Sequence, residues 1–266
     1  MSKILSCLTL SDAYKSIYSI LKISEIEVNN FLCKIDDCAD ISINDFINTY
    51  DIDASKKINI DCILVSHVTT AFDECEYIKN NGLTNTRKVF EYATPLKRFL
   101  KENNIEIKTM NNEYGLYYKD KCINTEEENN LFRMKLDHDY QINTIFYSDD
   151  AIKYGNVKYC PEILREINKK IPLLIEDLWI KNTKPYVLTL KIKIEQIKSC
   201  TFYDRDYEFG THNFTSDDKN KWLIKKVLEY IYNVKNFNTV SDKYFFLNDN
   251  VDIMPECIMD IKEEQR

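Results

Sequence analysis

Two kinds of hydrophobic periodicity follow one another irregularly along this chain, and they limit the folds open to it. Apolar residues recur at every second position from 186 to 194, within a stretch over 186–197 that is typical of a strand. The stretch 216–234 instead follows a helical period, with its apolar residues on or near one face. We expect further strands over 58–68, 142–147, 243–247 and 257–262, a hairpin around 114–118, and helices over 71–81, 92–103 and 161–178. Because strands and helices do not alternate as in a parallel sheet, the pattern predicts an α+β fold.

The first 56 residues differ from the rest of the chain. Their apolar residues recur at three- and four-residue spacing, and Ser42 is placed to cap a short helix. From Ile58 the sequence changes to a run rich in β-branched residues, which indicates a buried strand. We therefore predict two domains, a helical N-terminal module over residues 1–56 and a second domain over residues 57–266.

Glycine and charge exclude several ways of holding a nucleotide. The chain has only four glycines in 266 residues, so it contains neither a phosphate-binding loop nor the glycine-rich fingerprint of dinucleotide-binding folds. The formal net charge is −7, so no chain-wide positive field attracts nucleic acid. A nucleotide ligand, if there is one, must be held in another way.

Cysteine and histidine do not form a metal-binding pattern. The nine cysteines are scattered without a Cys-x-x-Cys pair, and the three histidines are His67, His138 and His212. We therefore expect no metal, and free thiols in a reducing cytoplasm. No apolar run approaches the roughly 18 residues that would span a bilayer, and the N-terminus lacks the pattern of a secretion signal, so we expect a cytoplasmic protein without membrane contact.

One segment places a histidine and a threonine at the end of an expected buried strand. His67 and Thr69 are separated by Val68, so they point to the same face of an extended chain, and a helix ending at Gly82-Leu83 follows. This order of strand, His-x-Thr, helix and Gly-Leu resembles the first motif of the ADP-ribosyltransferase fold, in the diphtheria toxin and poly(ADP-ribose) polymerase branch. The resemblance implies that His67 hydrogen-bonds the adenosine ribose of NAD and that Val68, with Thr69 beside it, contacts the nicotinamide through its backbone. The alternative is a strand-end histidine bound only by backbone.

A second aromatic segment resembles the second motif of the same family. Its strand ends at Tyr147-Ser148, and the helix after it supplies Tyr154. A planar nicotinamide ring has to be held between aromatic faces so that its glycosidic bond is oriented for attack. The resemblance implies that Tyr147 and Tyr154 do this. Because the chain has 18 tyrosines, core or surface packing is the alternative role for both.

The third motif of the family is a glutamate beside a late strand, and here the sequence departs from the pattern. No Glu stands directly before the expected strand 243–247. Asp242 is the nearest acid, with Asp252 and Glu256 in the following segment as substitutes. The resemblance covers roughly residues 58–262 and leaves the N-terminal module unexplained.

The resemblance implies an NAD-dependent ADP-ribosyltransferase with a split antiparallel or mixed sheet, in which His67 and either Asp242 or Glu256 act on NAD. A protein acceptor is preferred, while lysines over 219–226, together with Lys191 and Lys193, leave RNA or DNA open. Such an enzyme would be toxic, so we expect a toxin or an effector of bacterial or phage conflict, with the N-terminal helices docking a partner or activator. The alternatives are an NAD glycohydrolase and an inactive interaction or regulatory protein of the same fold.

Overall fold

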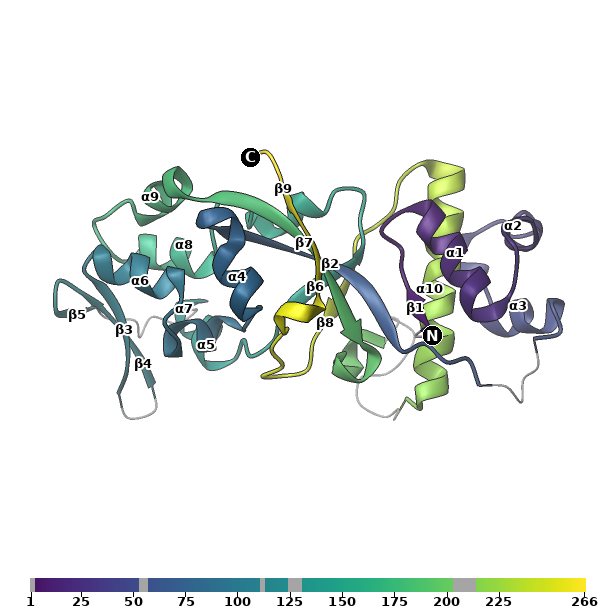
Figure 1. The fold of residues 1–266 in the computed structure, drawn as a ribbon, viewed down its shortest axis with the longest axis horizontal. Coiled ribbons are helices and arrows are strands. Elements are labelled where there is room, and N and C mark those ends of the chain that lie inside the picture. The colour runs from purple at the N-terminus through teal and green to yellow at the C-terminus, as the bar shows by residue number, and fades with distance from the viewer. Residues whose placement is uncertain (1–2, 53–56, 111–112, 124–130, 203–213) are drawn as a thin grey trace. The chain divides into compact units, whose positions relative to one another are not determined.

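The computed structural model describes residues 3–52, 57–110, 113–123, 131–202 and 214–266. Helices and strands are mixed along the chain (Figure 1), which confirms the α+β class. Contacts divide the chain into two compact units. Unit 1 consists of Met1–Ser66, Thr144–Asp149 and Leu190–Phe246, and unit 2 of His67–Asn143, Asp150–Thr189 and Leu247–Arg266. These divisions do not fall at residue 56, where the sequence predicts a domain boundary.

Unit 1 contains the N-terminal helices. Helices α1 (Leu10–Leu21), α2 (Glu25–Leu32) and α3 (Ile43–Thr49) all pack against α10 (Ser216–Phe237). Each of the four begins at a hydroxyl side chain that accepts a hydrogen bond from a backbone N–H of its first turn, namely Thr9, Ser24, Ser42 and Thr215. The N-terminal segment is thus helical as predicted. It groups with α10 because its short amphipathic helices bury their apolar faces against that longer helix.

One sheet has the strand order β8-β6-β2-β7-β9, with β1 paired to β2. Its strands are β1 (Ile4–Leu5), β2 (Cys62–Ala71), β6 (Asn143–Tyr147), β7 (Lys184–Lys193), β8 (Lys243–Phe246) and β9 (Ile258–Glu263). Strand β1 runs parallel to β2, whereas β6 pairs antiparallel to β2 with Ser66 opposite Ile145. The expected strands therefore exist, with ends shifted by a few residues. The structure establishes this mixed sheet but not the ADP-ribosyltransferase type.

Unit 2 contains most of the remaining elements. Its helices are α4 (Glu76–Asn81), α5 (Thr86–Glu91), α6 (Pro95–Glu102), α7 (Leu131–Asp137), α8 (Glu162–Asn168) and α9 (Ile175–Asn182), and its short 3₁₀ turns include η2 (Asp73–Cys75), η3 (Ala151–Asn156) and η6 (Pro255–Cys257). The helix expected over 161–178 is split into α8 and α9 around Pro172, as proline requires. Instead of a hairpin around 114–118, that stretch is the middle strand of an antiparallel sheet formed by β3 (Ile105–Met110), β4 (Glu113–Tyr118) and β5 (Lys121–Ile123).

The core of unit 2 packs aromatic rings against the end of the strand that carries His67. Trp179 of α9 meets Phe99 of α6 edge-on at 5.1 Å between ring centroids and Phe72 at 4.9 Å. Its indole N–H donates to Thr70 Oγ1 of β2 at 2.9 Å. These contacts fix the second half of β2, and with it the strand face that presents His67 and Thr69.

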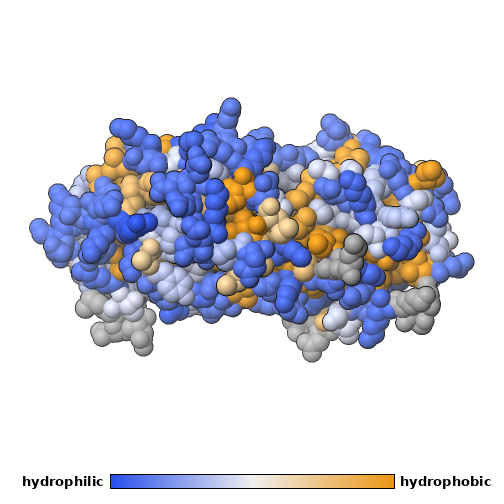
Figure 2. Space-filling view, viewed as in Figure 1, coloured by the Kyte–Doolittle hydropathy of each residue, from blue (hydrophilic) through white to orange (hydrophobic). Residues whose placement is uncertain are grey.

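The surface seen in Figure 2 is mostly hydrophilic, with apolar residues exposed in separate patches. Among the described residues, no helix combines the length and the apolar character needed to cross a bilayer. None of the nine cysteines forms a disulfide.

Candidate functional site

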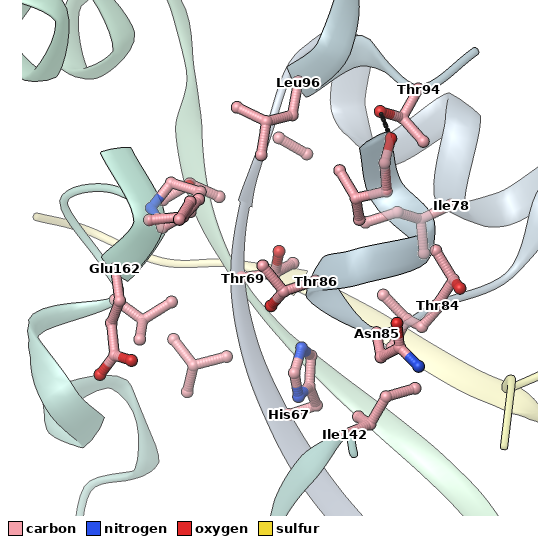
Figure 3. A pocket seen from close by; sticks show the side chains of 18 of the residues that line it. His67, Thr69, Ile78, Thr84, Asn85, Thr86, Thr94, Leu96, Ile142 and Glu162 are labelled. Atoms are coloured by element: carbon pink, nitrogen blue, oxygen red, sulfur yellow. Dashed lines mark hydrogen bonds between the residues drawn. The ribbon is translucent and has the colours of Figure 1, made fainter. Parts of the chain in front are cut away.

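Unit 2 contains a cavity of about 260 Å³ whose lining comes from several separate segments. Strand β2 supplies the stretch from His67 to Ala71, and the turn after α4 supplies the stretch from Gly82 to Thr86. Tyr154 of η3 and Glu162 of α8 also line it. In Figure 3, the side chains of Thr84, Asn85 and Thr86 stand on one side of His67, and Glu162 stands on the other. Four of the residues that the sequence predicts for NAD binding, His67, Val68, Thr69 and Tyr154, thus line one cavity.

The protonation of His67 follows from its hydrogen bond. Its Nδ1 lies 2.8 Å from the backbone oxygen of Asn143, which only accepts, so Nδ1 carries the hydrogen. Burial lowers the pKa of His67, and the bond to Asn143 opposes this only in part. At neutral pH the ring is therefore uncharged, and Nε2 presents a lone pair. A ligand group that donates a hydrogen bond, such as a hydroxyl, fits this atom.

Asn143 also connects His67 to Tyr154. Burial raises the pKa of Tyr154, while a side-chain hydrogen bond with Asn143 lowers it, and the raised value prevails. Tyr154 thus remains a neutral phenol. The Oδ1 atom of Asn143 is buried and has no hydrogen-bond partner among the described residues. Sequence patterns did not reveal Asn143, because its backbone oxygen meets the His67 ring across 76 positions of the chain.

The wall opposite β2 is held in place by helix caps. Gly82 ends α4 with φ at +79°, and the next residues lead to Asn85, the N-cap of α5. Asn85 is buried, accepts from the Lys88 N–H at 3.0 Å and donates to the Tyr140 oxygen at 3.0 Å. Thr94 caps α6 in the same way and donates from Oγ1 to the Val89 oxygen at 2.8 Å, the bond drawn in Figure 3. These polar groups therefore have structural roles and leave the wall mainly apolar toward the cavity.

A lysine and two carboxylates form the charged part of the lining. Lys135 Nζ lies 2.5 Å from Glu162 Oε2 and 3.0 Å from Asp139 Oδ2. Burial acts to lower the pKa of Lys135, but its bonds to Glu162 and Asp139 outweigh this and raise it. Lys135 thus stays protonated and neutralised by its neighbours, so it is not a free cation for a phosphate group.

Two predicted site residues lie in unit 1 and do not line the cavity. Tyr147 is buried, and its ring centroid lies 5.2 Å from that of Tyr230. Asp242 accepts from Ser148 Oγ at 2.5 Å and from Tyr244 OH at 2.6 Å, so each carboxylate oxygen takes part in a hydrogen bond with a neighbouring side chain. The structure therefore gives Tyr147 a packing contact and Asp242 a role in fixing local side chains.

The other two late acids lie in unit 2, where their surroundings differ. Asp252 accepts from Thr84 Oγ1 and from Lys88 Nζ, both at 2.8 Å. Glu256 is exposed in η6, directly before β9, and η6 packs against α4, which contributes Tyr77 and Ile78 to the cavity. Glu256 is not itself part of the lining. Of the two, it is the acid that no structural hydrogen bond occupies in the described part of the chain.

The possible metal ligands of the described ranges, which omit His212, stay apart from one another. Within those ranges, histidine, cysteine and carboxylate side chains do not gather in groups of three that could hold a metal ion.

Acid should destabilise the fold through His67. Its pKa in the folded state is below the ordinary value near 6.5. The neutral ring therefore contributes stability that is fully present above about pH 6.5 and is lost as the pH falls toward the lowered pKa. Urea unfolding between pH 7.5 and 5 measures this as a falling free energy of unfolding. His67→Gln, which does not titrate, should show a shallower fall, and matching slopes for both proteins would contradict the assignment.

Comparison of the chain with protein-family models, with curated proteins and with solved structures found no match.

Proposed function

We propose that this protein is an NAD-dependent ADP-ribosyltransferase. The observation that carries the proposal is the convergence of three separate segments on one cavity: His67 and Thr69 from β2, Leu83 after the glycine turn, and Tyr154 from η3. These are the segments in which the sequence resembles that family. The volume of about 260 Å³ is near the lower end for small-molecule sites. It suits the nicotinamide ribose half of NAD rather than the whole dinucleotide, so we assign His67 to the nicotinamide ribose and not to the adenosine ribose that the resemblance implies.

The polar groups of the cavity support a nucleoside as the ligand. The free Nε2 of a neutral His67 accepts a hydrogen bond from a ribose hydroxyl. Tyr154 offers an aromatic ring to a planar ligand, and Ile78, Leu96 and Ile142 add apolar side chains to the lining. Among the described lining residues the lysine is Lys135, and carboxylates engage it, which leaves the phosphates of NAD outside the cavity.

Glu256 is the acid that this proposal favours over Asp242. Both oxygens of Asp242 accept hydrogen bonds from Ser148 and Tyr244, whereas the exposed Glu256 belongs to the same unit as the cavity. A carboxylate is needed because the reaction develops positive charge on the ribose. Substitution of Asp242 therefore serves as the control for substitution of Glu256.

The chemistry that this arrangement supports is cleavage of the bond between ribose C1′ and the nicotinamide nitrogen. The bonding electron pair stays on the nitrogen, which neutralises the ring, and the ribose becomes an oxocarbenium ion. Tyr154 orients the ring, and the Glu256 carboxylate stabilises the developing charge. A nucleophile of the acceptor then bonds to C1′ and loses its proton.

The acceptor we favour is a protein side chain rather than RNA or DNA. The lysines expected to form a basic track on α10 are largely paired with acids: Lys221 with Asp217 at 2.7 Å, and Lys226 with Glu229 at 2.8 Å. Paired cations release few counterions and bind phosphates weakly. On the N-terminal helices, Tyr18 and Ile26 are 58% and 72% exposed, and a partner or activator docked there would cover them. We extend the proposal to a toxic effector of bacterial or phage conflict.

Calorimetric titration with NAD tests the site. We expect His67→Ala to bind NAD at least about tenfold more weakly than the wild type, because the ribose hydroxyl loses its acceptor. His138→Ala, at an exposed histidine outside the cavity, is the matched control and should bind like the wild type. Equal binding by His67→Ala and the wild type would remove His67 from the site.

Labelled NAD in lysate then identifies the reaction. Label in protein supports the favoured acceptor, and label in nucleic acid replaces it with RNA or DNA. Free ADP-ribose without labelled macromolecules would mean an NAD glycohydrolase. Absence of nicotinamide release under all conditions would mean a non-enzymatic interaction protein.

A further inference from the structure

Asp252 joins the late part of the chain to the wall of the cavity. Its Oδ1 accepts from Thr84 Oγ1 at 2.8 Å, and its Oδ2 accepts from Lys88 Nζ at 2.8 Å. Thr84 lines the cavity, and Lys88 lies on the helix that follows it. The Lys88 ammonium also donates to the Asn250 oxygen at 2.9 Å. Both oxygens of Asp252 thus hold other parts of unit 2 in place.

Backbone contacts extend this junction, which we call the brace and define as residues 250–254. Leu83 and Ile253 exchange two backbone hydrogen bonds of 2.9 Å each, as an antiparallel bridge. The Asn250 N–H donates to the Tyr140 oxygen at 2.8 Å, and the same oxygen accepts from Asn85. The brace therefore binds two parts of unit 2 that lead into the cavity lining, the turn at 83–86 and the segment around Tyr140.

Residues of the brace do not appear in the cavity lining, so they act on the site through other residues. Two residues after the brace, Glu256 stands in η6. We infer that Asp252 is a positioning residue: it fixes the segment that carries Glu256 to the turn at 83–86, and so fixes the carboxylate relative to the cavity. This inference rests on the proposed function, since it needs Glu256 to act on a ligand there. The sequence predicts Asp252 as a substitute for the family's glutamate, whereas this inference gives it a positioning role.

Three variants separate positioning from packing. Asp252→Leu removes both acceptors, Asp252→Asn keeps an acceptor for Thr84 but loses the charge facing Lys88, and Thr84→Val removes the hydroxyl. Asp260→Asn, at an exposed acid of β9, is the matched control. Each full-length protein is measured for the kcat and KM of nicotinamide release, for its thermal midpoint, and for hydrogen exchange of the Leu83 and Ile253 amides.

We expect Asp252→Leu to lower kcat by about 10- to 100-fold, because a misplacement of about 1 Å has this effect on oriented chemistry. Its KM should change less than threefold or so, since His67 and Tyr154 still bind NAD. Exchange at Leu83 and Ile253 should become faster. Asp252→Asn should recover much of kcat, and Thr84→Val combined with Asp252→Leu should add little to Asp252→Leu alone.

Several outcomes would overturn the inference. If Asp252→Leu keeps the wild-type kcat at a temperature well below its midpoint of thermal unfolding, Asp252 contributes to packing alone and does not position Glu256. Lost kcat with fully protected Leu83 and Ile253 amides would mean that Asp252 acts directly on the ligand. If the wild type releases no nicotinamide, the proposed function fails and the inference about Glu256 fails with it, while the exchange data still report whether Asp252 holds the brace. If Asp252→Leu does not fold, the kcat values of Asp252→Asn and Thr84→Val test the inference, and wild-type kcat in both would overturn it.

Discussion

Glu256→Gln is expected to lower nicotinamide release by about 100- to 1,000-fold, with NAD binding changed less than about twofold. The substitution keeps the size of the side chain and removes the negative charge that, under the proposed function, stabilises the ribose cation. The positive charge on the ribose develops only in the transition state. The substitution therefore lowers kcat and leaves the affinity for NAD nearly unchanged. Release of nicotinamide, followed by chromatography, and calorimetric titration with NAD measure the two quantities separately.

Asp242→Asn is the matched control for Glu256→Gln. Asp242 is held by Ser148 and Tyr244, so its substitution should leave nicotinamide release close to the wild-type rate. The reverse result, an active Glu256→Gln and an inactive Asp242→Asn, would show that Asp242 and not Glu256 is the catalytic acid. It would also remove the reason for the brace inference.

Gly82→Ala should cost about 3 kcal/mol or more of unfolding free energy. At φ +79° an L side chain is strained, and the added Cβ would lie 1.9 Å from the Ile253 backbone oxygen. The brace would have to move away from the turn to accommodate it. For a chain of this size, the midpoint of thermal unfolding should fall by roughly 6–12 °C.

Gly155→Ala provides the comparison for Gly82→Ala. Gly155 also has a positive φ, of +53°, but an added Cβ there comes no closer than 3.6 Å to any neighbour. Its cost should be only about 1–2 kcal/mol, from the left-handed backbone alone. Equal losses at the two glycines would show that the contact with Ile253 is soft and that the brace yields easily.

The sequence predicted those elements whose signal is local and strong. The two-residue period located β7, and the helix expected over 92–103 is α6. Its start is a local signal, because the Thr94 cap and the first-turn proline Pro95 act within one turn of helix. Helices α5 and α7 were missed. They have six and seven residues, too short for a clear hydrophobic period, and tertiary packing against each other and against their neighbours stabilises them.

The candidate site was predictable in part for the same reason. His67, Val68, Thr69 and Tyr154 belong to short motifs that can be read locally, and they line one cavity. Asn143, Lys135 and Glu162 have no such pattern, because their roles depend on side chains distant in sequence. The late acids show the limit most clearly: Asp242, Asp252 and Glu256 look alike in sequence, and only their hydrogen bonds tell them apart.

The contact between Thr84 and Asp252 joins residues that are 168 positions apart. A ribosome that adds 5–20 residues per second needs roughly 10–30 s to make that length of chain. During this interval the turn at 83–86 has been synthesised, but the segment that secures it has not. A nascent chain therefore carries an incomplete site. Under the proposed function, NAD cleavage begins only after the brace has been synthesised and has bound the turn at 83–86.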